Sequence, residues 1–257
     1  MRDILAQFVD ITREAGFIAL RDFKLAEQTA ATVHYKHGGS PVTAADIATD
    51  TYLRETCARV FTDCAWLSEE TIDNNARLSA TKLIIADPID GTRAYIAGNP
   101  HWCVSLAMLE HGRPVMGCLY APALDELYVA SLGQGATLNN VPLFISGNEK
   151  NNILGPKPMV AWFNQRFKTD YTILPKIPSL ALRLAHVSTG RVALALASDN
   201  AHDWDIAAAD LIICEAGGIL VDFNGQRPVY NQPKPVHAAL FACSEIILEN
   251  LMSHTKI

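Results

Sequence analysis

The stretch "TKLIIADPIDGTRAYIAG" (residues 81–98) is an apolar run that ends in two acids three residues apart. The segment from Leu83 to Ala86 has the composition of a buried strand, and the proline and glycine that follow it indicate a turn. Two like charges, Asp87 and Asp90, therefore stand where the backbone turns. Carboxylates gathered in this way repel each other, and the repulsion falls when a divalent cation binds between them. A metal site is one interpretation, and spacing alone leaves an ordinary Asp-Pro turn as the other.

The sequence "DPIDG" is suited to both a metal ion and a phosphate group. Its proline fixes the turn, so that Asp87, the backbone carbonyl of Ile89 and Asp90 can face one ion together. Gly91 and Thr92 then offer backbone N–H groups and a hydroxyl at the start of a predicted helix, where phosphate oxygens bind well. Two metal ions bridged by such carboxylates can hold the attacking and leaving oxygens of a phosphoryl transfer.

Three more acids lie at predicted ends of helices and strands, namely Glu69, Glu70 and Asp205. Oxygen ligands without a cluster of histidine or cysteine favour Mg²⁺ or Mn²⁺ over zinc. Asp46 lies in a predicted helix with Asp50 and Arg54 at four-residue spacing, and this pattern by itself is also that of a solvated helix face.

The composition bounds the class of protein. The 257 residues are 49% hydrophobic and 19% charged, which suits one large domain or two intimately packed halves. A net charge of -6 without a basic cluster argues against nucleic-acid binding, and no apolar run is long enough to span a membrane. The N-terminal residues carry a charge every few positions, so we expect no signal peptide. The six cysteines form no C-x-x-C pair, and we expect buried thiols in a reducing cytosol.

Hydrophobic periodicity predicts the order of the elements. Helices are expected at residues 2–26, from an entry at 40–46, and at 179–188, 203–216 and 244–253. Strands are expected at residues 83–86, in an antiparallel meander of 103–109, 115–120 and 126–130, and at 192–197 and 238–242, with a strand, an Asn-Gly turn and a second strand over 219–229. The polar stretch at 147–158 predicts a boundary between an N-terminal half, 1–146, and a C-terminal half, 147–257.

The motifs "EE" (69–70), "DPIDGT" (87–92) and "WDIAAADLIICEAGG" (204–218) resemble, in this order and spacing, the paired signatures of the inositol monophosphatase superfamily. The similarity runs over nearly the whole chain. It implies an α+β fold, a layered α-β-α-β-α sandwich of two intimately packed halves. It also implies a Mg²⁺-dependent, lithium-sensitive phosphomonoesterase, a cytoplasmic hydrolase that commonly forms a homodimer.

The resemblance also implies the roles of single residues. The first metal ion would be bound by Glu69, Asp87 and the Ile89 carbonyl, the second by Asp87, Asp90 and Asp205, and a weaker third by Glu70. With Glu69, the residues Thr92 and Asp46 would be catalytic, because they orient and help to deprotonate the attacking water. The Gly91 and Thr92 amides would bind the phosphate, and Lys36 matches a lysine of the family's mobile loop.

The expected substrate depends on two departures and one further resemblance. Ser68 replaces the usual glycine before the acid pair, which should leave the ligands undisturbed. A glutamate that takes sugar hydroxyls in the inositol-preferring branch falls here at Ala197 or Ser198. The segments "GGSPVTAAD" and "PSLALRLAHV" resemble the bacterial 3'(2'),5'-bisphosphate nucleotidase branch, which makes Ser179 and Arg183 candidates for binding the distal half of the substrate.

Three alternatives stay open at this point. Arg183 fits a plain helix-surface charge as well as a substrate ligand. Within the enzyme reading, 3'-phosphoadenosine 5'-phosphate is the favoured substrate and an inositol monophosphate the next, whereas the histidinol-phosphatase branch matches poorly after residue 170. A different class is the extragenic-suppressor branch, whose members act by binding the transcription machinery. The complete set of metal ligands counts against that class.

Overall fold

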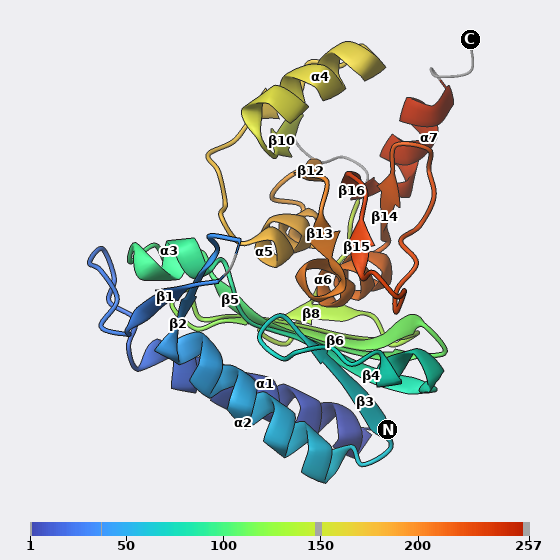
Figure 1. Cartoon of the computed structure of the whole chain (residues 1–257). Coiled ribbons are helices and arrows are strands. Elements are labelled where there is room, and N and C mark those ends of the chain that lie inside the picture. Colours follow the sequence, from blue (N-terminus) through green and yellow to red (C-terminus); the bar gives the residue numbers. More distant parts are fainter. Residues whose placement is uncertain (1, 37, 147–150, 254–257) are drawn as a thin grey trace.

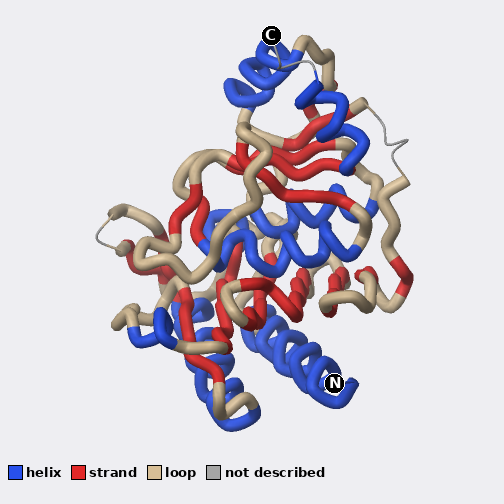
Figure 2. The backbone as a smooth tube through the Cα atoms, turned by 90° about the vertical axis from the view of Figure 1, so that its right-hand side faces the viewer, coloured by secondary structure: helices blue, strands red, loops and turns tan. Residues whose placement is uncertain are grey.

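The computed structural model describes residues 2–36, 38–146 and 151–253, and its elements stack in five layers (Figure 1). Helices and sheets alternate through the molecule, which is the layered α-β-α-β-α sandwich that we expected. Figure 2, a view turned by 90°, shows the same succession of helical and sheet layers.

The first two layers are a helix pair and a seven-stranded sheet. The helices are α1 (Arg2–Leu20) and α2 (Ala44–Val60). The sheet has the order β3-β4-β5-β6-β7-β8-β9, and only its β3–β4 pair is parallel. Its strands are β3 (Cys64–Ser68), β4 (Lys82–Asp90), β5 (Cys103–Glu110), β6 (Arg113–Ala121), β7 (Glu126–Ser131), β8 (Ala136–Leu138) and β9 (Val141–Pro142). The predicted meander is therefore confirmed as β5, β6 and β7.

The remaining layers are two central helices, a second sheet and two outer helices. The central helices α5 (Leu180–Ala185) and α6 (Asp203–Glu215) pack between the sheets, and a 3₁₀ helix, η2 (His186–Thr189), follows α5. The second sheet has the order β11-β10-β12-β16-β14. Its strands are β10 (Asn152–Leu154), β11 (Thr172–Ile173), β12 (Leu194–Ala197), β14 (Gly218–Asp222) and β16 (Leu240–Ser244), and the outer helices are α4 (Lys157–Phe167) and α7 (Glu245–Ser253).

Short elements complete the chain around the central layers. They are the ribbons β1 (Val33–Tyr35)–β2 (Pro41–Thr43) and β13 (Ala201–His202)–β15 (Val236–His237), the 3₁₀ helix η1 (Ala76–Ser79) and the helix α3 (Thr92–Ile96). No helix of the described residues is long and apolar enough to cross a membrane. All six cysteines are free, and four are buried as expected, whereas Cys64 and Cys214 are only half-buried.

Strand β4 explains the continuous apolar run of the opening motif. Leu83 and Ile85 pack toward α5 and α6, whereas Ile84 and Ala86 pack toward α1 and α2. Because both faces of the sheet are covered, the strand has no solvent face that would require alternating polar residues.

One predicted helix is too long, and one predicted strand is absent. The first helix ends at Leu20 instead of residue 26, because Phe23 leaves the helix and packs its ring at 5.6 Å from Tyr95 and 5.4 Å from Trp102. The second strand after the Asn-Gly turn is absent from residues 226–230, where Tyr230 instead donates a hydrogen bond to α6. The predicted boundary at residues 146 and 147 adjoins residues 147–150, which lie outside the described residues, and it stays a prediction.

Candidate metal centre

The end of β4 places Asp87 and Asp90 beside each other. Asp87 pairs with Ser105 and Asp90 with Cys103, and the ladder is irregular between these two pairs. The irregularity contains the proline of the motif, which cannot donate a ladder hydrogen bond. The strand therefore continues through the turn, and both carboxylates are buried at its end.

Asp90 is held by the second half of the chain. Its Oδ2 accepts hydrogen bonds from the Ala181 backbone N–H at 2.6 Å and from the Ser179 hydroxyl, and its Oδ1 accepts from the Leu180 N–H at 3.2 Å. These donors are the first turn of α5, where a negative charge is favoured. Ser179 is fully buried and also caps α5, so its hydroxyl does not face a substrate.

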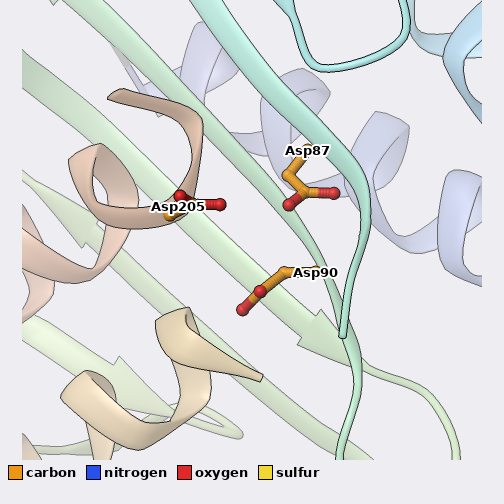
Figure 3. Close-up of side chains that lie close together, drawn as sticks. All are labelled: Asp87, Asp90 and Asp205. Carbon is orange, nitrogen blue, oxygen red and sulfur yellow. The ribbon is translucent and has the colours of Figure 1, made fainter. Parts of the chain in front are cut away.

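The third acid of the site comes from the start of α6. Asp205 is the third residue of this helix, and its Oδ2 accepts from the His202 backbone N–H at 2.7 Å in a capping box. Carboxylate oxygens of Asp87, Asp90 and Asp205 lie within 4.8 Å of one another (Figure 3). Two distant segments, β4 and α6, thus bring three carboxylates around one space.

Burial and mutual repulsion act on these acids together. Burial, followed by the charges of Glu69, Asp90 and Asp205, raises the pKa of Asp87 well above its usual range. Burial and then the Asp205 carboxylate raise the pKa of Asp90 to about 7. A divalent cation among the oxygens would offset both effects, and an all-oxygen donor set fits Mg²⁺ or Mn²⁺.

The acid pair after β3 lies against a lysine. Lys36 Nζ is 2.8 Å from Glu69 Oε1 and 2.7 Å from Glu70 Oε1. Burial lowers the pKa of Lys36, but the two carboxylates raise it more. Burial raises the pKa of Glu70 to about 7 despite the ammonium group. Lys36 thus forms ion pairs with the two predicted metal ligands, Glu69 and Glu70. Its contact with a substrate phosphate stays a prediction.

Asp46 and Thr92 meet at the edge of the site, and their role on the attacking water stays a prediction. The Thr92 hydroxyl lies 3.2 Å from Asp46 Oδ1 and 3.1 Å from the Ile89 carbonyl oxygen. The other Asp46 oxygen accepts from the Thr43 N–H at 2.7 Å and completes the N-terminal cap of α2. Asp46 is only 1% exposed, so the alternative of a solvated helix residue is wrong. Its burial raises its pKa to about 6.

Gly91 makes the turn into α3 possible. Its φ of 97° is in the left-handed region, and a side chain there would meet the His101 carbonyl oxygen at 3.3 Å. A glycine is therefore required at the point where the chain passes from the acids of β4 to Thr92.

Comparison with known sequences identifies the family. The sequence profile of the inositol monophosphatase family matches residues 1–256. The chain belongs to this family. An inositol monophosphatase of Dictyostelium discoideum is 32% identical over 87% of this chain and 86% of its own length. The Nus factor SuhB of Pasteurella multocida is 29% identical over 96% of this chain and 95% of its own length.

Solved structures of the family agree with the fold. A Thermotoga maritima IMPase superposes with a TM-score of 0.82 at 26% identity, covering 98% of this chain and 96% of that one. The extragenic suppressor protein SuhB of Bartonella henselae gives 0.83 at 24% identity over 99% of both chains, a likeness of fold. The family is one of metal-dependent phosphatases, and its acid cluster is present here. The relatives divide between inositol monophosphatases and SuhB proteins, so they do not decide the branch.

The position of Arg183 in this family member corrects the prediction that it binds substrate. The guanidinium donates to the carbonyl oxygens of Ile177 at 2.9 Å and 3.1 Å, of Leu196 at 3.2 Å and of Pro178 at 3.4 Å. The side chain is buried, which lowers its pKa, and its donors are taken up by the backbone. The alternative of a helix-surface charge is also wrong, and Arg183 instead ties α5 to β12.

A cavity of about 250 Å³ opens above the acids of this inositol monophosphatase fold. Two exposed cations that sequence reasoning missed, Arg93 and Lys176, belong to its lining. Arg93 directly follows the "DPIDGT" motif, and Lys176 precedes the Ser179 cap of α5 by three residues. That proximity to both motifs is the signal that could have found them. The cavity is also lined by predicted residues: Glu69, Asp87, Asp90, Gly91, Thr92 and Asp205.

Proposed function

We propose that the protein is a Mg²⁺-dependent phosphomonoesterase that hydrolyses a small phosphate ester. The observation that carries the proposal is the trio of Asp87, Asp90 and Asp205, whose oxygens lie within 4.8 Å at the bottom of a cavity. These three residues would hold one ion, and Glu69 with the Ile89 carbonyl would complete the ligands of another. When bound, a divalent cation supplies Lewis-acid polarisation of a phosphoryl oxygen.

Thr92 and Asp46 supply the base side of the proposed reaction. The Thr92 hydroxyl can accept a hydrogen bond from an attacking water while it donates its own proton to Asp46 Oδ1, 3.2 Å away. Burial raises the pKa of Asp46 to about 6, which suits a carboxylate that takes up a proton near neutral pH. The Thr43 N–H on the other oxygen keeps the carboxylate oriented.

We propose a bisphosphorylated nucleotide, 3'-phosphoadenosine 5'-phosphate, as the favoured substrate and an inositol monophosphate as the next. Lys176 and Arg93 support this ranking, because both are exposed cations that line the cavity, whereas its acids would hold the metal ions and, through them, the reacting phosphate. Among the described residues Lys176 pairs with no acid, and Arg93 donates only a long bond of 3.4 Å to the Gly39 carbonyl. A second phosphate would give both cations a partner.

The absence of an acid at the end of β12 supports the same ranking. The two residues at this place are Ala197, which is fully buried, and Ser198. Neither has the carboxylate that binds sugar hydroxyls in the inositol-preferring branch. A hydroxyl left without a partner in a closed site costs about 1–3 kcal/mol.

Side-by-side hydrolysis of the two substrates tests the proposal. We expect activity with Mg²⁺, no activity with EDTA, recovery on adding Mg²⁺, and a higher kcat/KM for the bisphosphate. Lys176→Gln should raise KM for the bisphosphate by about tenfold and leave that for inositol 1-phosphate unchanged, since one charge-assisted bond is worth roughly 1.5–3 kcal/mol. Lys157→Gln, an exposed lysine at the start of α4, is the matched control. If the protein hydrolyses no phosphate ester, the proposed phosphatase activity is wrong. If it prefers inositol 1-phosphate, only the ranking of the two substrates is wrong.

The SuhB relatives favour a second candidate, binding to the transcription machinery. The Nus factor SuhB of Pasteurella multocida aligns with 96% of this chain. A pull-down of RNA polymerase with the purified protein tests this candidate, and the Asp90→Asn variant shows whether binding needs the acid site. The complete acid set favours hydrolysis as the main function.

The oligomeric state and ion sensitivity belong to the same proposal. We propose a cytoplasmic homodimer whose activity is inhibited by lithium, as the family resemblance implies. Light scattering of the purified protein and a lithium titration of the Mg²⁺-activated enzyme test these two properties.

A further inference from the structure

A buried arginine links the segment that follows Glu69 and Glu70 to residues that contact the start of α6. Arg77 lies in η1, which follows the loop that carries Glu69 and Glu70, and only 1% of it is exposed. Its Nε and Nη2 donate to Asp73 Oδ2 at 3.0 Å and 2.7 Å. Its Nη1 donates to Asn231 Oδ1 at 2.7 Å, and Asn231 Nδ2 returns a bond of 3.1 Å to the Arg77 carbonyl. The arginine therefore joins residues 154 positions apart in the sequence.

The same link continues into α6. The Asn231 backbone N–H donates to Asp203 Oδ2 at 2.8 Å, and His237 Nε2 lies 2.7 Å from Asp203 Oδ1. Asp203 is fully buried and is the first residue of α6, two positions before Asp205. Its own N–H donates to the Pro235 carbonyl at 3.0 Å, so the β13–β15 ribbon also fixes this turn. We call Arg77, Asn231, Asp203 and His237 the Arg77 bridge.

The composition of the Arg77 bridge calls for a reason beyond stability. A buried ion network is often no more stabilising than apolar residues of the same volume, because each charge must be desolvated. Such a network fixes the relative position of the segments that it joins, because its hydrogen bonds are all satisfied in only one arrangement. The Arg77 bridge spans two segments whose acids, Glu69 and Asp205, line the same cavity.

We propose that the four residues of the Arg77 bridge are positioning residues that set the separation between Asp205 and the acids of the first half, and so set the affinity for the metal ion. The inference rests on the proposed metal site. None of the four residues is itself a predicted ligand. Their effect would pass through the first turn of α6 on one side and through the segment from Glu69 to Arg77 on the other.

Direct binding of Mn²⁺ to the metal-stripped, full-length protein tests this role. Electron paramagnetic resonance of free Mn²⁺ gives the Kd without any need for turnover. We expect Asp203→Asn to raise the Kd about tenfold, the lower end of the range for outer partners of metal ligands. The concentration of Mg²⁺ for half-maximal activity should rise by the same factor, while kcat at saturating Mg²⁺ stays within about threefold of wild type.

Arg77→Met separates positioning from a simple charge effect. Removing a positive charge near a cation site would by itself tighten Mn²⁺ binding, whereas loss of the Arg77 bridge should weaken it severalfold. Arg77→Lys keeps the charge but not the planar fork, and should weaken binding as well. The double variant Arg77→Met/Asp203→Asn should weaken binding by less than the product of the two single effects, because both remove the same link.

Glu215→Gln is the control, an acid at the end of α6 that accepts from the Gly133 and Gly135 N–H groups outside the Arg77 bridge, and should leave the Kd unchanged. Circular dichroism establishes that each variant is folded; if Asp203→Asn is not, His237→Phe removes one partner of Asp203 and decides the question. An unchanged Kd in the folded bridge variants, or tighter binding by Arg77→Met, would overturn the positioning role. Failure of the wild type to bind Mn²⁺ would instead overturn the proposed metal site.

Discussion

Helix α6 carries two kinds of acidic site, one at its start and one along its length. Asp205 stands at the start and faces Asp87 and Asp90, with oxygens within 4.8 Å of each other. Asp210 lies further along and lines a larger cavity of about 660 Å³. Its Oδ2 accepts from the Tyr230 hydroxyl at 2.8 Å, and its Oδ1 from the Cys214 thiol at 3.5 Å.

The comparison shows that neighbours, more than burial or cavity size, distinguish a metal centre. Burial raises the pKa of Asp210 and of Asp90 alike. Hydrogen-bond donors lower the pKa of both carboxyls again, but Asp90 also faces the Asp205 carboxylate, which raises its pKa further. Hydrogen-bond donors can satisfy a single buried carboxylate such as Asp210, but carboxylates that face each other also need a cation. Within the described ranges, Asp87 and Asp90 of β4 with Asp205 of α6 are the one group of three acids whose oxygens lie close enough together to hold an ion.

The largest expected effect separates the two sites directly. Asp90→Asn should lower kcat by several powers of ten, because loss of a metal ligand forfeits several kcal/mol of charge stabilisation and each ~1.4 kcal/mol is tenfold. Asp210→Asn, which also alters a buried acid, should keep near-wild-type turnover. Steady-state kinetics on folded proteins measures both. Near-wild-type turnover by Asp90→Asn would remove Asp90 from the metal centre.

A smaller effect is expected from Thr92, which with Asp46 would activate the attacking water. Thr92→Ala should lower kcat by roughly 10²- to 10⁴-fold, the usual contribution of general acid–base catalysis. The Mg²⁺ concentration for half-maximal activity should change much less than kcat, because the hydroxyl contacts none of the acid trio and touches, among the proposed ligands, only the Ile89 carbonyl at 3.1 Å. A Mg²⁺ titration of the variant decides the matter. Weaker Mg²⁺ activation with unchanged kcat at saturation would show that Thr92 serves the ion instead.

The smallest effect concerns stability and pH. The folded protein raises the pKa of Asp46 to about 6 and of Asp90 to about 7, so it holds protons there that the unfolded chain has lost. These acids therefore stabilise the metal-free protein most at low pH, and this contribution is lost as pH rises through about 6 to 7. Mg²⁺ binds the ionised acids, so it should raise the Tm by on the order of 5 °C at about pH 8 and hardly at about pH 5.5.

Thermal unfolding with and without Mg²⁺ at the two pH values measures this effect. Asp210→Asn should keep the pH-dependent shift, and Asp90→Asn should lose most of it. Equal stabilisation by Mg²⁺ at both pH values would mean that the ion does not compete with protons for these carboxylates.

The sequence by itself determined the elements and residues whose chemistry is local. The apolar run of β4 and the left-handed Gly91 follow from short-range sterics, and the run of α6 from apolar residues spaced three or four apart, although β4 continues through the predicted turn to Asp90. The acid set also needed only the motifs and their order, because the family resemblance rests on them. For the same reason the resemblance could assign Asp46 and Thr92 to one attacking water, whereas their contact is given by the coordinates.

Only the tertiary structure decided where the long polar side chains go. Arg183 lies on a predicted helix where it fits a surface charge, yet its guanidinium donates to backbone carbonyls that include that of Leu196 on β12. Arg77 carries no sequence signal of its partner, and it is buried against Asn231, 154 positions away. Lys176 shares the cavity with the acids of β4 because α5 packs on Asp90. Each outcome depends on distances between segments far apart in the chain, and local pattern carries no information about those distances.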